Sequence, residues 1–422
     1  MADDPTISRR GSTGILASSA VAAASAIAVT IISARVLSVA DNAEFITFWS
    51  LLFGLFQVVG GVQNEATRAI SSLGTDAAGR PAGSRAPVVA MPLALGGGLA
   101  VLTGVAAASV GDRLGAGLSA GVVLVSLLVI VGYACHLTII GTLAGRHHWG
   151  WLAGLNAAEA LVRVTAVAIA GLTARALGSL QLAAALPAVT WLALVLWALP
   201  VRRALTARTS LDLATLLRNG LLTVVSSASA AVLINGFPAI VRIVLTPRVA
   251  GSDLVPLLLA IQVTRAPLMM PLVAFQGVAI AAFVARRHDH LAALARPLLL
   301  IASLGVLVAV AMGLVGPWGI RLLYGQGYRV APLVCVALTA AAISLAVLTV
   351  SGAAALAISQ HRAFATGWVV AAIVTIGLLW LPVTPLLRPA IAVGIGPLLG
   401  AAILWWAIHR HDARVRSEPV RG

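Results

Sequence analysis

Residues 297–318 read PLLLIASLGVLVAVAMGLVGPW and contain no charged side chain. An α-helix needs about 20 apolar residues to cross the hydrocarbon core of a bilayer, because each residue adds about 1.5 Å. This run is therefore predicted to form a membrane-spanning helix.

Eleven further apolar runs flank this one. Together the predicted spans are 14–36, 45–66, 87–110, 117–143, 151–173, 180–200, 220–245, 254–284, 297–318, 331–358, 363–382 and 387–408. Across the 422 residues, 60% are hydrophobic and only 10% are charged, whereas soluble domains carry roughly 25% charged residues. This composition excludes a soluble or disordered chain, and it predicts an all-α polytopic membrane protein with about twelve spans.

The basic residues indicate topology. There are 28 basic against 13 acidic residues, giving a formal net charge of +15. If the N-terminus is cytoplasmic, eighteen arginines fall on the cytoplasmic side and seven on the outer side. This excess predicts a plasma-membrane protein with both termini in the cytoplasm, and no nucleic-acid partner. No His/Cys cluster has metal-ligand spacing, so we expect no metal and no cofactor.

A polar stretch, 201–219, divides the spans six and six. We expect an N-terminal lobe at 1–200, a cytoplasmic linker at 201–219, and a C-terminal lobe with a basic cytoplasmic tail at 220–422. An even number of spans in each half makes any repeat parallel, and such lobes typically enclose a central substrate cavity. The short loops leave no room for a soluble catalytic domain, so we do not expect an enzyme.

The fifth predicted span carries Asn156, Glu159 and Arg163 on one helical face. A charge in a span costs about 2.5–3.5 kcal/mol on insertion scales, and it persists where it faces water, a partner or a ligand. Glu159 and Arg163 form either an internal ion pair that faces another helix, or part of a cavity wall. Glu159 is the only carboxylate expected deep in a span, which makes it the candidate for ion coupling.

The seventh predicted span is interrupted at 235–238, which reads NGFP. Proline removes one helical hydrogen bond and clashes with the preceding turn. Gly236 and Pro238 therefore mark either a hinge for alternating access or a static kink. Asn235 and Arg242 lie seven residues apart on one face and are candidate substrate-binding residues.

The eighth predicted span contains Arg265 about twelve residues, or ~18 Å, from its start. This depth exceeds what a snorkelling side chain reaches easily. Gln262 lies one turn away, and Gln276 lies further along the same side. Arg265 therefore lines a cavity with these glutamines, or it is satisfied by backbone carbonyls that Pro267 and Pro271 free.

Basic side chains dominate the predicted spans: Arg163, Arg242 and Arg265, joined by Arg35 at the end of the first span, against Glu159. A cavity with this sign suits an anion, and the planar guanidinium fork matches phosphate oxygens. A cation exporter would be expected to show the opposite sign. For Arg35 and Arg242, which lie near the outer interface, snorkelling is an alternative explanation.

Three motifs resemble one family. Residues 33–37 read SARVL and are followed by Glu44 and Phe45, which resembles the entry of polysaccharide flippases in the multidrug/oligosaccharidyl-lipid/polysaccharide exporter superfamily. Residues 322–331, LLYGQGYRVA, are similar to the stretch before that family's tenth helix, and the 156–163 pattern resembles its fifth-helix motif. Ser38 and Ala43 depart from the family's usual glycine and aromatic residue.

The resemblance implies two six-helix lobes around a central cavity. It also implies alternating-access flipping of a polyprenyl-diphosphate-linked oligosaccharide or polysaccharide precursor to the outer leaflet, with membrane lipid and a polysaccharide polymerase or ligase as partners. Twelve spans rather than fourteen argue against the peptidoglycan-precursor branch. The alternatives are a multidrug or cation exporter of the same superfamily, and a non-transporting scaffold or lipid-processing enzyme.

Overall fold

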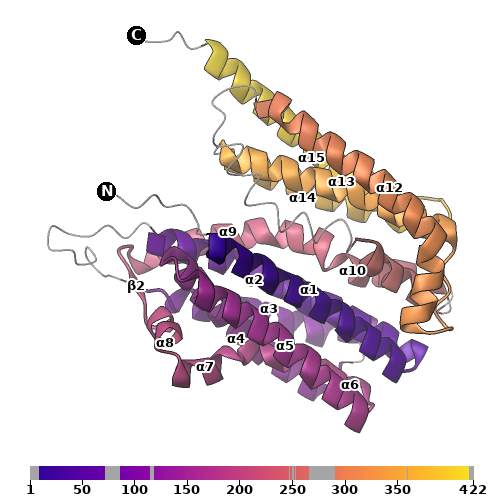
Figure 1. The fold of residues 1–422 in the computed structure, drawn as a ribbon, viewed down its shortest axis with the longest axis horizontal. Coiled ribbons are helices and arrows are strands. Elements are labelled where there is room, and N and C mark those ends of the chain that lie inside the picture. Colours follow the sequence, from indigo (N-terminus) through magenta and orange to yellow (C-terminus); the bar gives the residue numbers. More distant parts are fainter. Residues whose placement is uncertain are drawn as a thin grey trace. The chain divides into compact units, whose positions relative to one another are not determined.

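The computed structural model describes residues 9–71, 86–114, 118–246, 248–249, 251, 253–265, 290–358 and 360–417. Contacts divide the chain into two units, Met1–Gly236 and Phe237–Gly422. Each unit is described by itself below, with the elements labelled as in Figure 1.

Helices long and apolar enough to cross a membrane dominate the described residues. Ten meet this description: Thr13–Val36, Val39–Ser71, Ala90–Ser109, Ala120–Gly145, Trp149–Thr173, Leu177–Trp197, Leu213–Ile234, Leu294–Tyr324, Pro332–Leu356 and Arg388–Ala413. A shorter apolar helix covers Arg362–Leu378, and a further helical segment covers 253–265. Each predicted span thus coincides with helix over at least part of its length, which confirms the all-α polytopic fold class. The remainder of the eighth span, beyond 265, lies outside the described residues.

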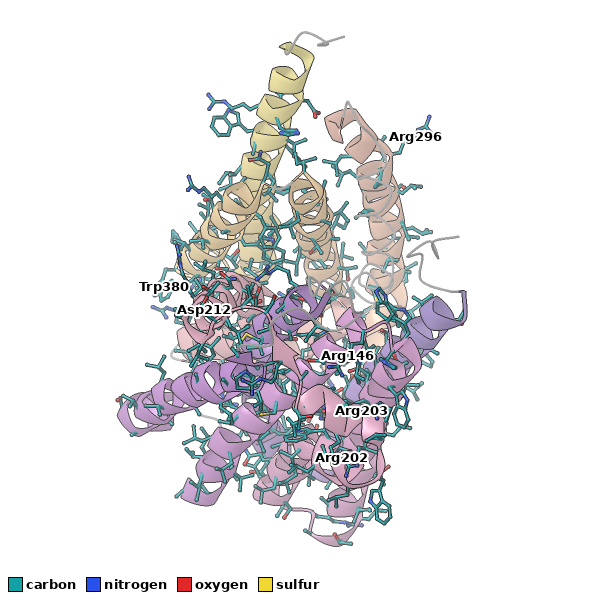
Figure 2. The ribbon with its side chains drawn as sticks, turned by 90° about the vertical axis from the view of Figure 1, so that its left-hand side faces the viewer. Arg146, Arg202, Arg203, Asp212, Arg296 and Trp380 are labelled. Carbon is teal, nitrogen blue, oxygen red and sulfur yellow. The ribbon has the colours of Figure 1, made fainter. Side chains whose placement is uncertain are left out.

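The first unit packs around one central helix, α2. Its elements are α1 Arg9–Val36, α2 Val39–Ser71, β1 Ala86–Pro87, α3 Ala90–Leu114, α4 Ala120–Gly145, α5 Trp149–Thr173, α6 Leu177–Ala185, the 3₁₀ helix η1 Leu186–Val189, α7 Trp191–Trp197, α8 Leu199–Leu205, β2 Arg208–Thr209 and α9 Leu213–Ile234. Helix α2 packs along α4 and α9, and α1 packs along α5 (Figure 1). Arg146, at the end of α4, donates to the carbonyl of Arg203 in α8 at 3.3 Å (Figure 2).

Glycines set the close approach of α2 to its neighbours. A Cβ atom added at Gly61 would overlap the backbone of Thr223 in α9. A Cβ atom added at Gly141 of α4 would overlap the carbonyl of Gln63 in α2. Small residues permit such spacing between helices where lipid provides no hydrophobic drive, so these positions fix the packing of α2.

The predicted seventh span is two helices. Helix α9 ends at Ile234 and α10 begins at Phe237, so the structure confirms the predicted interruption at Asn235 and Gly236. The amides of both interrupting residues donate to the carbonyl of Ala231, at 3.1 and 2.8 Å. The break therefore keeps its backbone donors satisfied without continuing the helix.

Helix α9 begins before the predicted span, at Leu213, inside the expected 201–219 linker. Asp212 caps it, because its carboxylate accepts from the Thr215 hydroxyl at 2.6 Å and from the Thr215 amide at 3.1 Å. These bonds to Thr215 lower the pKa of Asp212 from its ordinary value. Packing on α2 groups α9 with the first unit, so contacts divide the chain after Gly236. The six-plus-six organisation stays a prediction.

The second unit packs around α13. Its described elements are α10 Phe237–Leu245, the helical segment 253–265, α12 His290–Tyr324, α13 Pro332–Ala357, α14 His361–Leu378 and α15 Arg388–Ser417. Helix α13 contacts α12, α14 and α15, and α14 packs along α15 (Figure 1). These helices hold the basic groove described below.

Candidate functional site

Glu159 and Arg163 on α5 form a buried ion pair, and each residue is 6% exposed. Arg163 Nη1 donates to Glu159 Oε2 at 3.2 Å, and Nη2 donates to Oε1. Arg163 Nε donates to the carbonyl of Ala184 at 3.1 Å, near the end of α6. Protein groups therefore engage all three guanidinium nitrogens, and the geometry is that of the internal ion pair.

A column of aromatic rings, most of them stacked, adjoins this pair. Arg163 lies over the ring of Phe53 at 4.8 Å. Successive ring centroids are separated by 6.1 Å for Phe45–Trp49, 4.1 Å for Trp49–Phe53, 5.5 Å for Phe53–Phe56, 3.9 Å for Phe56–Tyr133 and 5.4 Å for Tyr133–His136. The rings belong to α2 and α4, so this column ties these two helices together beside a buried cation.

His136 ends the aromatic column. It is 1% exposed, and within the described part of the chain its Nδ1 has no hydrogen-bond partner. Its ring stacks on that of Tyr133, with 5.4 Å between the centroids. A packed histidine explains this position without a ligand.

Asn235, at the break after α9, contacts α2. Its Nδ2 donates to Gln57 Oε1 at 2.6 Å. A Cβ atom at Gly54 would lie 3.6 Å from Gly236, so the backbones approach closely at the same point. Phe53, Gly54 and Gln57 fall within about one turn of α2. This turn therefore contacts both Arg163 and the helix break.

Arg265 lies against the start of α10. It is 8% exposed, and its guanidinium carbon lies 4.9 Å from the ring centroid of Phe237. Phe237 is fully buried and is the first residue of α10. The structure thus brings the deep arginine of the eighth span to the break in the seventh. Gln262, one turn earlier, is half-buried.

The other predicted site residues are less enclosed. Asn156 is half-buried one turn before Glu159, and Arg242 is half-buried in α10. Arg35 is exposed at the end of α1, as expected for a snorkelling side chain. Gln276, with Pro267 and Pro271, lies outside the described residues.

Two further polar residues of α2, Glu65 and Gln57, make side-chain contacts. Glu65, at the end of the second predicted span, is 2% exposed and pairs with Arg68, with contacts of 2.7 and 2.5 Å. Gln57 was not singled out. The sequence could have indicated Gln57, because it is a polar residue in an apolar run and shares a helical face with Gly54 and Gly61.

No group of three or more His, Cys, Asp or Glu residues is placed to hold a metal ion within the part of the chain that the structure describes. Cys135 and Cys335 are free and buried. Among the described residues, the candidates in each unit are a buried arginine and the aromatic ring that it lies over.

Comparison with known sequences shows mycobacterial relatives. The chain is 33% identical over 394 residues to uncharacterized protein Rv3630 of Mycobacterium tuberculosis, covering 93% of this chain and 90% of that one. Uncharacterized protein Mb3654 of Mycobacterium bovis matches to the same extent. Uncharacterized protein Rv1510 of Mycobacterium tuberculosis is 35% identical over 274 residues, 65% of this chain and 63% of that one. No protein-family model matches the chain.

Solved structures with the same fold are transporters. A multidrug resistance MATE family transporter of the MOP superfamily, in an inward-facing conformation, superposes with a TM-score of 0.66 at 15% identity, covering 94% of this chain and 96% of that one. The lipid II flippase MurJ, in an inward closed conformation, gives 0.68 at 13% identity, covering 97% and 90%. These likenesses confirm the predicted fold of the multidrug/oligosaccharidyl-lipid/polysaccharide exporter superfamily.

Proposed function

The chain belongs to the family of Mycobacterium tuberculosis protein Rv3630, and we propose from this premise and its exporter fold that it is an alternating-access membrane transporter. Its substrate is a polyprenyl-diphosphate-linked oligosaccharide or polysaccharide precursor, moved from the cytoplasmic to the outer leaflet of the plasma membrane. One solved protein of this fold is a lipid II flippase, which supports a lipid-linked substrate. Both termini are proposed to be cytoplasmic, and a polysaccharide polymerase or ligase is a proposed partner.

The observation that carries this proposal is the position of Arg265. The Phe237 ring covers one face of the buried Arg265 guanidinium. The N–H donors of Arg265 point outward in the plane of the guanidinium. A planar fork of donors is suited to bidentate contact with phosphate oxygens. Because Phe237 begins α10, bending at the break would change the surroundings of Arg265. The diphosphate contact is in this way coupled to the hinge at Gly236 and Pro238.

The remaining residues have proposed supporting roles. Asn156, Asn235 and Gln262 are suited to hydrogen bonds with sugars or phosphate, and Arg163 to a second phosphate contact. The Glu159 carboxylate holds Arg163 in the described state and is the proposed ion-coupling group. In this scheme the ion pair must open during the transport cycle, so that a substrate phosphate replaces Glu159 as the partner of Arg163. Arg35, Arg242 and Gln276 complete the proposed substrate path.

The test is export in a host that lacks the native gene. Arg265→Ala is expected to lower export by about ten-fold or more, because a charge-assisted hydrogen bond contributes about 1.5–3 kcal/mol. Lipid-linked glycan should then accumulate on the cytoplasmic side. Arg265→Lys, which keeps the charge, guards against loss by misfolding, and Arg296→Ala is the control, since Arg296 is exposed on α12 (Figure 2). Wild-type export by Arg265→Ala, at equal membrane abundance, would show that the substrate site lies elsewhere.

A multidrug or cation exporter is the second candidate, favoured by the MATE family transporter of the same fold. It predicts that drug resistance depends on Glu159 and not on Arg265. Resistance assays on Glu159→Gln and Arg265→Ala in a drug-sensitive host distinguish the two functions.

A further inference from the structure

A basic groove lies between α14 and α15 in the second unit. Its volume is about 280 Å³, and its polar and aromatic lining comes from Gln360, Arg362, Thr366, Trp406, Arg410 and His411. No carboxylate is among the described residues that line it. The groove is separate from the buried arginine at Phe237, and the proposed transport function makes no use of it.

The groove forms beside a close approach of α14 and α15 at Gly367 and Gly400. A Cβ atom at Gly400 would overlap the carbonyl of Gly367, and one at Gly367 would lie 3.0 Å from the carbonyl of Gly400. Beyond this glycine contact the facing positions carry larger side chains, including Arg362 and Trp406. The two helices therefore present a lined depression where α14 begins and α15 approaches its end.

The charges of the groove favour an anion. The Arg410 guanidinium lies 3.9 Å over the ring of Trp406, which orders it at the groove wall. Arg362 is exposed in the first turn of α14, whose positive helix end adds to its charge. The nearest acidic residue on α15, Asp412, is 3% exposed and does not line the groove.

The surface of the same two helices is apolar beyond the groove. Ile373 on α14 is 65% exposed and Leu399 on α15 is 46% exposed. Trp406, at 56% exposure, lies between this apolar surface and the arginines, as in the aromatic belt at a membrane interface. A ligand with a phosphate head and acyl chains matches both parts, since its chains follow the apolar surface while its phosphate reaches the arginines.

We propose that this groove binds the phosphate headgroup of an anionic membrane lipid. Arg362 and Arg410 hold the phosphate oxygens, and Trp406 fixes Arg410 and contacts the glycerol region. With the C-terminus in the cytoplasm, as the arginine distribution predicts, the lipid belongs to the cytoplasmic leaflet. The lipid stays bound at the edge of the second unit and is not the transported substrate.

Native mass spectrometry of the full chain in detergent tests this proposal. The protein is titrated with phosphatidylglycerol or with phosphatidylcholine of identical acyl chains. The wild type is expected to retain phosphatidylglycerol preferentially. Arg362→Gln/Arg410→Gln should weaken that binding by about ten-fold or more, because it removes both charge-assisted contacts to the phosphate. Phosphatidylcholine binding should not change.

The matched control is Arg202→Gln/Arg203→Gln, which removes the same charge from exposed positions on α8 (Figure 2). It should bind phosphatidylglycerol as the wild type does. Equal weakening in both double variants, or no preference for phosphatidylglycerol in the wild type, would overturn the proposal. Displacement of phosphatidylglycerol by excess inorganic phosphate would assign the groove to free phosphate and also overturn it.

A third variant keeps the test decisive if the double variant is poorly folded. Trp406→Leu leaves the net charge unchanged and removes the ring that orders Arg410. It should lower phosphatidylglycerol binding while its melting temperature stays near that of the wild type. Unchanged lipid binding by this variant would contradict the role assigned to the groove.

Discussion

Glu159→Leu is expected to destabilise the protein by about 3–5 kcal/mol, since removing one member of a buried pair leaves the other charge uncompensated. The structure sets the size of this effect. Both residues are 6% exposed, so water cannot replace the lost carboxylate. Among the residues that the structure describes, Arg163 would keep only the Ala184 carbonyl and the Phe53 ring. These two contacts fall short of balancing a full buried charge.

The double variant Glu159→Leu/Arg163→Met should recover most of this loss. Replacing a buried ion pair with apolar residues of similar volume is often neutral or stabilising. The assay is thermal unfolding of the detergent-purified chain, measured beside export in the deletion host. A stable double variant that exports nothing supports the functional role of the pair, whereas wild-type export makes the pair purely structural. Wild-type stability of the single Glu159→Leu variant would refute the buried-pair reasoning.

Three other predictions concern packing, helix capping and one side-chain hydrogen bond. Gly61→Ala should lower stability by about 1–3 kcal/mol through overpacking against α9, whereas Gly60→Ala, where an added Cβ meets nothing within 4 Å, should be neutral or stabilising in thermal unfolding. Asp212 has a lowered pKa, so its cap stabilises α9 above the unfolded-state pKa, and this contribution is lost as pH falls through the folded-state value; the melting temperature of Asp212→Ala should therefore depend less on acid pH than that of the wild type. In a double-mutant cycle, Gln57→Leu and Asn235→Leu should couple by about 0.5–3 kcal/mol, and strictly additive effects would contradict the hydrogen bond between them.

The fold was predictable because its main signal is local. A run such as 297–318 shows its lipid environment by composition alone, and the NGFP stretch at 235–238 predicts the break because proline and glycine act on their own backbone. The Glu159–Arg163 pair follows from their spacing on one helix. The early start of α9 was missed because hydropathy undervalues a polar first turn, although Asp212 is a typical N-cap residue.

The site was only partly predictable because its remaining contacts join distant segments. The amide pair of Gln57 and Asn235 is separated by 178 positions. The acceptor for Arg163 Nε is a main-chain carbonyl, that of Ala184, which no side-chain pattern reveals. The contact of Arg265 with Phe237 likewise requires the packing of two helices.

The interruption between α9 and α10 has a mechanical consequence. Because α9 ends at Ile234 and α10 begins at Phe237, bending between them breaks few helical hydrogen bonds. Helical hydrogen bonds therefore add little stiffness at this point. Gln57 holds the first residue of this interruption, because its Oε1 accepts from Asn235 Nδ2 at 2.6 Å. If the chain works by the proposed alternating access, exchanging Gln57 is therefore expected to change the rate of that cycle.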